Sequence, residues 1–268
     1  MKDVNAPDTA LLCDIRPDGV ARITLNRPDI HNAFDDVLIA GLTAMLGSLA
    51  TDPMVRVVQL TGAGKSFSAG ADLNWMKRMA DYSHAENLAD SKALARLMKT
   101  LNFLPKPTIA LINGAAFGGG VGLAACCDIA IASNRAVFCL SEVKLGLIPA
   151  VISPYVIEAI GTAQARRYFL SAERFDAATA QRIGLIHDIV PEDRLLARGD
   201  ETAALLVQNG PHAMQAAKDL IYAVANRPID DAMIDDTANR IAKLRASAEG
   251  REGIRAFLEK RAAQWVKE

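Results

Sequence analysis

Short runs of apolar, β-type residues recur along the first half of the chain and predict strands. Residues 10–28 predict a β-hairpin with its turn at Pro17-Asp18-Gly19. Residues 55–62 and 107–114 are two further β-rich runs, and each ends at a glycine. Residues 128–142 predict two more strands joined by a turn. Strands of this kind, alternating with helices, indicate an α/β fold.

Apolar residues at helical spacing mark the segments between and after these strands. Residues 32–53 predict a helix that stops before a proline. Residues 76–100 are polar at first and helical later, which is typical of a surface helix or of a lid beside a binding site. From about Gly161 the chain is predicted to stay helical. The predicted segments are 162–172, 176–184, 194–210, 211–226, 229–246 and 251–266.

Length and composition agree with one large core and an appendage. The chain has 268 residues, of which 51% are hydrophobic, and a formal net charge of −1. We expect an α/β core in residues 1–200 and a helical region in residues 201–268 that serves packing or oligomerisation. The near-neutral charge, with no block of like charges, argues against nucleic acid or an anionic membrane surface as a partner.

The N-terminal residues and the spacing of the cysteines both predict a cytoplasmic protein. Residues 1–19 carry acids and a proline where an export signal would have a continuous apolar run. No stretch is long and uncharged enough to span a bilayer, so we expect a soluble, cytoplasmic protein. Cys13, Cys126, Cys127 and Cys139 form no CxxC pair, and no histidine lies at ligand spacing from them. We therefore expect buried, reduced thiols and no metal site.

Two small-residue loops carry the candidate chemistry. They span residues 62–72 and 113–128, and each follows a parallel-type strand and leads into a helix. Small residues let the backbone approach a ligand, and the start of a helix presents free N–H groups. The two loops could place one N–H each on a single oxygen, which would form an oxyanion hole. Alternatively, the glycines serve only tight packing of helix against sheet.

Two nucleotide-binding interpretations of these loops fail. Gly64-Lys65-Ser66 matches the end of a P-loop, but Gln59 stands where a P-loop needs a glycine, and no helix begins at the lysine. Gly120-x-Gly122 faintly resembles a dinucleotide fingerprint, but Ala125 occupies the third glycine position. The acidic residue twenty positions later does not end a second parallel strand.

Five stretches occur in an order and spacing typical of one known family. They are ITLNRPDIHNAF, LTGAGKSFSAGADL, KPTIALINGAAFGGGVGLAACCDIAIAS, AVFCLSEVKLGLIP and EGIRAFLEKR. Together they resemble the crotonase (enoyl-CoA hydratase/isomerase) superfamily over nearly the whole chain. The resemblance implies a crotonase-like spiral of β-β-α turns with a C-terminal helical trimerisation region. It also implies acyl-CoA thioester substrates, and a homotrimer or a dimer of trimers.

The resemblance assigns roles to residues of both loops. The two oxyanion donors fall on the N–H groups of Ala71 and Gly119, and Asp72 is expected to fix its loop. Ala69 would meet the adenine end of coenzyme A, and Lys65 would face the phosphates of coenzyme A.

Two further residues are expected to contact the substrate, and no metal or separate cofactor is expected. Arg27 and Lys260 are candidates for the same anionic coenzyme A handle, although Lys260 could equally be a surface lysine. No metal and no separate cofactor is implied, because coenzyme A is part of the substrate.

The sequence departs from the family at one catalytic position. A typical hydratase of this family has two glutamates, which correspond here to Gly122 and Glu142. Glu142 lies among apolar residues, so partial burial should keep a proton on its carboxyl. Either Glu142 acts as acid and base in one concerted step, or a carboxylate from the lid, such as Glu86, replaces the missing one.

The chemistry that follows has two forms. A hydratase adds water to a 2-enoyl-CoA, whereas an isomerase uses one carboxyl to move a double bond from the 3 to the 2 position. Residues 149–153 resemble the bacterial methylglutaconyl-CoA hydratases of leucine and isoprenoid breakdown, and this favours hydration.

The sequence disfavours two non-enzymatic functions known among relatives and offers several candidate pocket walls. RNA binding is disfavoured by the absence of a basic stripe, and an inactive scaffold by the retained Glu142 and both donor loops. Six residues are candidate pocket walls or ordinary core residues: Trp75, Met76, Met79, Tyr82, Phe117 and Tyr155.

Overall fold

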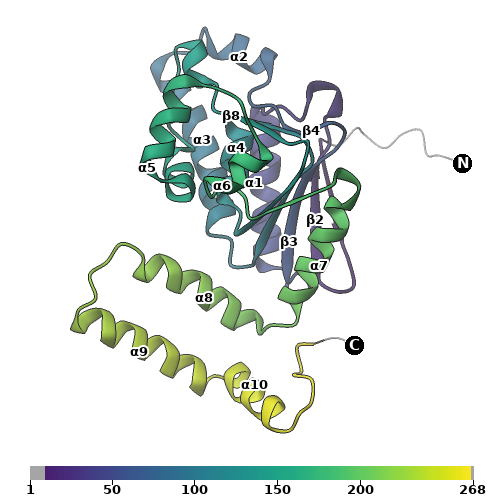
Figure 1. The fold of residues 1–268 in the computed structure, drawn as a ribbon, viewed down its shortest axis with the longest axis vertical. Helices are drawn as coiled ribbons and strands as arrows, with labels where there is room; N and C mark the ends of the chain where they lie inside the picture. The colour runs from purple at the N-terminus through teal and green to yellow at the C-terminus, as the bar shows by residue number, and fades with distance from the viewer. Residues whose placement is uncertain (1–9, 267–268) are drawn as a thin grey trace, which may run out of the picture.

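Two β-sheets organise residues 10–266, the part of the chain that the computed structural model describes (Figure 1). The first sheet has the strand order β1-β2-β3-β5-β7-β10 and the second β4-β6-β8-β9. The strands of the first sheet are β1 (Leu11–Ile15), β2 (Val20–Leu25), β3 (Val57–Gly62), β5 (Thr108–Ile112), β7 (Ile129–Ser133) and β10 (Asp188–Val190). Those of the second are β4 (Ser66–Ser68), β6 (Ala115–Phe117), β8 (Val137–Cys139) and β9 (Phe175–Asp176).

The chain passes through both sheets repeatedly, and this gives the fold its spiral form. β3 continues into β4, β5 into β6 and β7 into β8, and each pair is followed by one or more helices. The neighbours within each set, β3-β5-β7 and β4-β6-β8, are parallel. β1 pairs with β2, and β8 with β9, in antiparallel fashion. The predicted spiral of β-β-α turns is confirmed.

Helices cover both faces of the first sheet and extend beyond it. One face meets α1, α3, α4 and α5 in the larger hydrophobic core, and α7 packs on the other face against β3, β5 and β7. The helices of the body are α1 (Asp36–Thr51), α2 (Leu73–Met79), α3 (His84–Asn102), α4 (Gly119–Cys126), α5 (Ser153–Ser171), α6 (Ala177–Arg182) and α7 (Leu195–Val207). The remaining helices are α8 (Pro211–Val224), α9 (Asp231–Ala246) and α10 (Ala248–Leu258), and they lie together below the body in Figure 1.

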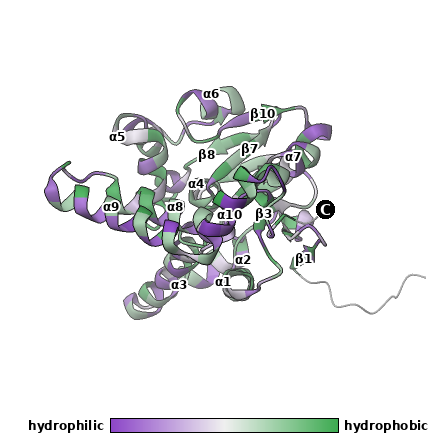
Figure 2. Ribbon diagram, turned by 90° about the horizontal axis from the view of Figure 1, so that it is seen from below, coloured by the Kyte–Doolittle hydropathy of each residue, from purple (hydrophilic) through white to green (hydrophobic). Residues whose placement is uncertain are grey.

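Alternation along the strands explains why both faces of the first sheet are covered. In β3, Val58 and Leu60 face the larger core, while Val57 faces α7. Side chains of a strand point to opposite faces in turn, so a strand that is apolar at every position must be buried on both sides. Figure 2 shows β3, β7 and β8 as mainly hydrophobic, whereas hydrophilic and hydrophobic residues mix along α9 and α10.

The predicted elements were mostly found, with corrections after residue 150. The hairpin, the first helix and the strands within 55–62, 107–114 and 128–142 are confirmed, although the last two strands join different sheets. The six helical segments predicted after Gly161 are found as α5 to α10, but the expectation that the chain stays helical throughout is wrong. α5 begins at residue 153 and bends at Gly161 (φ 72°, ψ 160°), β9 and β10 interrupt the helical region, and the last helix ends at Leu258.

Helix α8 connects the C-terminal helices to the body. Lys218 forms an ion pair with Asp128 at 2.9 Å, and the Asn102 amide donates to the Tyr222 hydroxyl at 2.9 Å. The Tyr222 ring also contacts the Phe103 ring, with 4.8 Å between centroids. The predicted division after residue 200 falls within α7, and it stays a prediction.

The cysteines differ in exposure. Cys126, Cys127 and Cys139 are buried free thiols, whereas Cys13 is free but exposed, so the expectation of burial is wrong for Cys13. Burial raises the pKa of the Cys127 thiol to about 12 and also raises that of Cys126. Both are therefore protonated near neutral pH.

Residues 1–9, on which part of the export-signal expectation rests, lie outside the described residues. Among the helices described, none is both long enough and apolar enough to cross a membrane.

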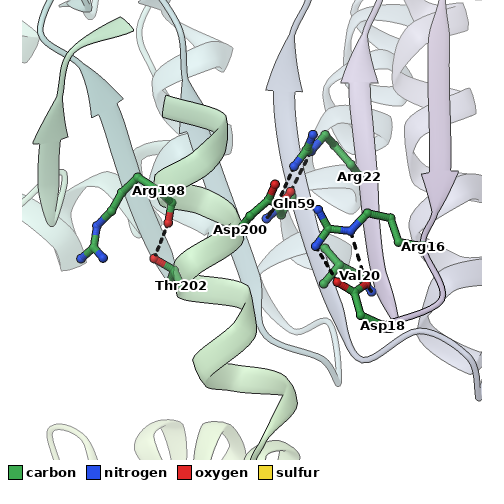
Figure 3. A network of polar contacts seen from close by, with 8 residues as sticks. All are labelled: Arg16, Asp18, Val20, Arg22, Gln59, Arg198, Asp200 and Thr202. Carbon is green, nitrogen blue, oxygen red and sulfur yellow. Dashed lines mark hydrogen bonds and ion pairs between the residues drawn. The ribbon is translucent and has the colours of Figure 1, made fainter. Parts of the chain in front are cut away.

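Asp200 ties α7 to the N-terminal strands. Its Oδ1 accepts hydrogen bonds from Arg16 (2.7 Å), Arg22 (2.6 Å) and Gln59 (3.2 Å) (Figure 3). Arg22 also donates to the Gln59 side chain at 2.8 Å. Burial acts to raise the pKa of Asp200, but the hydrogen bonds from Arg16 and Arg22 outweigh it and hold the pKa below its usual value.

We expect Asp200→Asn to lower the free energy of unfolding at pH 7 by about 1 kcal/mol, since the carboxylate is partly exposed and solvent screens it. Because the folded-state pKa is depressed, this stabilisation is present above the unfolded-state value of about 3.9. It is lost as pH falls through the folded-state pKa. Urea unfolding at pH 7 and at successively lower pH measures both effects. Asp18→Asn is the control, because Asp18 is half-exposed and forms an ion pair with Arg16 but not with Arg22. An equal effect of both variants at pH 7 would contradict the central role of Asp200.

Candidate active site

The carboxyl ends of three parallel strands meet at one edge of the second sheet. β4 is followed by Ala69, Gly70 and Ala71, and β6 by Gly118 and Gly119. β8 leads to Glu142, the first residue of a short 3₁₀ turn. Because β4, β6 and β8 are adjacent and parallel, these loops lie side by side, as at other ligand sites of α/β folds.

The Ala71 loop is held so that its amide is available. Phe34 donates its N–H to the Gly70 carbonyl at 2.7 Å and accepts from the Asp72 N–H at 2.7 Å. Successive backbone groups of an extended chain point to opposite sides, so the Ala71 N–H points away from Phe34. Asp72 then caps α2 by accepting from the N–H of Asn74 and Trp75. The expected role of Asp72 in fixing the loop is confirmed.

The Gly119 amide lies at the start of α4. Gly118 has φ 50°, a conformation that favours glycine, and donates its N–H to the Cys139 carbonyl at 2.9 Å. Gly119 is the first helical residue, and its N–H has no acceptor within residues 10–266. A Cβ on Gly70 would lie 3.4 Å from the Phe117 carbonyl oxygen, so the Ala71 and Gly119 loops are in contact.

Glu142 lies directly against the Gly119 loop. Its Oε1 is 3.1 Å from the position that a Cβ on Gly118 would take. Its Oε2 is buried and has no hydrogen-bond partner among the described residues. Burial raises the pKa of Glu142 above its ordinary value, and its own backbone N–H lowers it to a lesser extent. An unpartnered buried carboxyl oxygen is costly, which is typical of a group that functions on a bound molecule.

Of the two positions considered for a second carboxylate, one is a glycine and the other is engaged in a helix cap. Gly122 is buried, and a Cβ there would overlap Cγ2 of Ile152. Glu86 is exposed at the start of α3, where its Oε2 accepts from the Ser83 N–H (2.8 Å) and hydroxyl (2.6 Å). This capping box gives the Glu86 carboxylate a structural role.

The predicted contacts for coenzyme A are brought together only in part. Lys65 is exposed in the turn between β3 and β4, and it has no ion-pair partner in the part of the chain described. Ala69 follows β4, and its N–H donates to the His31 carbonyl at 3.0 Å. Lys260 follows α10 at the far end of the molecule from α2 and β4 (Figure 1), so it does not join the others within one chain.

Arg27 is placed near the donors but is already paired. Its guanidinium lies 2.7 Å from Asp35 and 4.0 Å from Asp72, and these aspartates cap α1 and α2. Contact of Arg27 with coenzyme A stays a prediction.

Sequence reasoning missed buried Asn32. Its side chain accepts from the Arg27 N–H and donates to the carbonyls of Ala63 and Ser66, which fixes the loop between β3 and β4. Its signal was the Asn-Ala pair within ITLNRPDIHNAF.

The candidate wall residues divide between core and loop positions. Trp75 is part of the larger core, and Met79 and Tyr155 pack against it. Phe117 is half-buried, and the Arg174 guanidinium lies 5.3 Å from its ring centroid. Met76 and Tyr82 are half-buried on and after α2.

The arrangement suits chemistry at a carbonyl. Two amides at the ends of neighbouring strands can stabilise an oxygen that gains negative charge, and a carboxyl beside them whose pKa is raised by burial can exchange protons with nearby atoms.

Comparison with known proteins identifies the family. The sequence profile of the enoyl-CoA hydratase/isomerase family matches residues 16–268. The chain belongs to this family. The 2,3-dehydroadipyl-CoA hydratase of Escherichia coli is 36% identical over 248 residues, which cover 92% of this chain and 94% of that protein.

Comparison with solved structures, among them one named as a crotonase from Legionella pneumophila with a TM-score of 0.92, confirms the crotonase fold. An enoyl-CoA hydratase from Shewanella pealeana is 49% identical, with a TM-score of 0.93 and coverage of 97% of both chains. AtuE of Pseudomonas aeruginosa is 38% identical, with a TM-score of 0.92, covering 97% of this chain and 100% of the other. Membership of the family implies an acyl-CoA substrate.

Proposed function

We propose that the protein is an enoyl-CoA hydratase that uses Glu142 as its only acid and base. The observation that carries the proposal is the Glu142 carboxyl: its Oε1 lies 3.1 Å from the place of a Cβ on Gly118, and its buried Oε2 has no partner among the described residues. The relatives from E. coli and S. pealeana are named as hydratases, which supports the same reaction.

The proposed step is concerted. The thioester carbonyl accepts hydrogen bonds from the N–H groups of Ala71 and Gly119 and becomes an enolate oxygen as water attacks C3. One oxygen of the Glu142 carboxyl takes the proton that water loses, while the other gives its proton to C2. The enolate electrons form the new C–H bond, the thioester carbonyl is restored, and the carboxyl ends protonated as it began.

We also propose which residues contact coenzyme A and how the chains assemble. Lys65 would face the phosphates and Ala69 the adenine, with Arg27 and Lys260 as further contacts. We propose a homotrimer or a dimer of trimers built through residues 201–268, and a cytoplasmic location. Supporting the assembly, large apolar side chains of this region are strongly exposed, among them Ile229 (90%) and Phe257 (82%).

The substrate we propose is 3-methylglutaconyl-CoA or a similar branched enoyl-CoA. Residues 149–153 carry the resemblance on which this rests. The E. coli relative is named for another enoyl-CoA that carries a second carboxyl group, which is consistent with this choice. The alternative activity is a double-bond shift in a 3-enoyl-CoA, which Glu142 could also carry out alone by moving a proton from one carbon to another.

We expect the purified protein to add one water to 3-methylglutaconyl-CoA, since Glu142 and the two amides supply every group that hydration requires. Mass spectrometry of the thioester after incubation measures this gain. Heat-inactivated protein is the control. No gain in mass, together with conversion of a 3-enoyl-CoA into its 2-enoyl isomer, would replace hydration with the isomerase activity.

A further inference from the structure

Gly118, just before α4, and Gly122 within α4 are both covered by other parts of the chain. The Glu142 carboxyl lies over Gly118, as described above. One turn later, a Cβ on Gly122 would lie 2.9 Å from Cβ of Ile152 and 3.3 Å from Cε of Met98. Residues four apart on a helix are neighbours, about 6 Å apart. Ile152 therefore covers the position next to Glu142.

Ile152 is held firmly in this position. Its side chain is 3% exposed and belongs to the larger core. It stands immediately before α5, and its carbonyl accepts the Val156 N–H at 3.1 Å. Met98 on α3 is fully buried and closes the same space from the other side. No side chain at position 122 can enter without displacing Ile152.

We propose that Ile152, seated on Gly122, is a positioning residue that fills the place of a second carboxyl and shields that side of Glu142 from bulk solvent, so that Glu142 alone carries the proton transfers. The inference rests on the proposed function of Glu142. A carboxyl at position 122 would lie one helical turn from Glu142, and two like charges at that separation raise one another's pKa. An apolar side chain there instead keeps Glu142 away from solvent.

Other titratable groups lie around this site. At the sheet edge, Lys144 and Arg174 lower and Glu142 raises the pKa of the Cys139 thiol, for which burial is the largest cause. The titratable residues of the helices that pack here include Cys126 of α4, Tyr155 and Glu158 of α5, and Arg96 and Lys99 of α3. Burial is the cause that raises the pKa of Glu142, so removal of an apolar neighbour should be detectable in its titration.

We expect Ile152→Ala to make Glu142 titrate at lower pH than in the wild type, because the space opened beside it admits water. The measurement is a ¹³C NMR titration of the ligand-free protein labelled at glutamate, with the Glu142 signal identified by its loss in Glu142→Gln. Ile160→Ala is the matched control, since Ile160 is a buried isoleucine two turns further along α5. An unchanged Glu142 midpoint in Ile152→Ala, or an equal shift in Ile160→Ala, would overturn the proposal.

A second experiment tests the exclusion by Ile152 without relying on the cavity that Ile152→Ala creates. Gly122→Glu alone should lower the melting temperature strongly, whereas Gly122→Glu with Ile152→Ala should recover part of that loss and show two coupled carboxyl titrations. Equal stability of the two proteins would contradict the exclusion by Ile152. Both experiments use protein without substrate, so they decide the role of Ile152 even if 3-methylglutaconyl-CoA is not hydrated. Conversely, failure of the hydration assay alone would count only against the proposed activity.

Discussion

Replacing Glu142 with glutamine should lower kcat by about 10²–10⁴-fold while leaving coenzyme A thioester binding nearly unchanged. Glutamine keeps the size of the side chain but can neither give up nor accept a proton at neutral pH. The binding contacts predicted for the thioester handle lie on other loops, at Lys65 and Ala69. Steady-state kinetics and calorimetric titration with a saturated acyl-CoA, which cannot react, separate the two effects.

Glu86→Gln is the matched control for this substitution. Glutamine can replace glutamate in a capping box, so α3 should keep its first turn and activity should stay close to that of the wild type. A large loss of kcat in Glu86→Gln would bring the lid carboxylate back into the mechanism. A near-normal rate in Glu142→Gln would remove Glu142 from it.

The strands that could be predicted from the sequence are those long enough to show a pattern of apolar residues. β3 and β5 are runs of five or six residues buried on both faces, so their composition alone predicts them. β4 and β6 have three residues each, too few for any periodicity, and they exist because the second sheet pairs them. β9 has only two residues and depends on pairing with β8. Such strands are decided by tertiary contacts.

The site shows the same limit. The two glycine loops were predicted from their residue types and Glu142 from the resemblance to the family, and the structure brings them together, while their roles stay predictions. The covering of Gly122 by Ile152 could not be predicted, since it joins residues thirty apart through packing. Arg27 was expected near coenzyme A from the resemblance of its motif to the family. Its pairing with the caps of α1 and α2 depends on where Asp35 and Asp72 lie in space.

Gly119→Pro should lower kcat by about 10²–10³-fold, because proline has no N–H to donate to the enolate oxygen. Proline is tolerated at the first position of a helix, which is where Gly119 lies, so α4 can still form. A complication is the new Cβ, which would lie 3.0 Å from Cε2 of Phe34. Part of any loss could therefore come from displaced packing.

Gly119→Ala separates the two causes, because alanine adds the same Cβ but keeps the N–H. We expect Gly119→Ala to lose some stability to the contact with Phe34 while retaining most of its rate. The rate of Gly119→Pro should fall well below that of the alanine variant at matched stability, which is measured by thermal unfolding of both proteins before the kinetics. If the two variants lose the same amount of rate, packing against Phe34 accounts for the effect, and the Gly119 amide does not act on the reaction. If only the proline variant fails, one backbone N–H at the start of α4 stabilises the transition state.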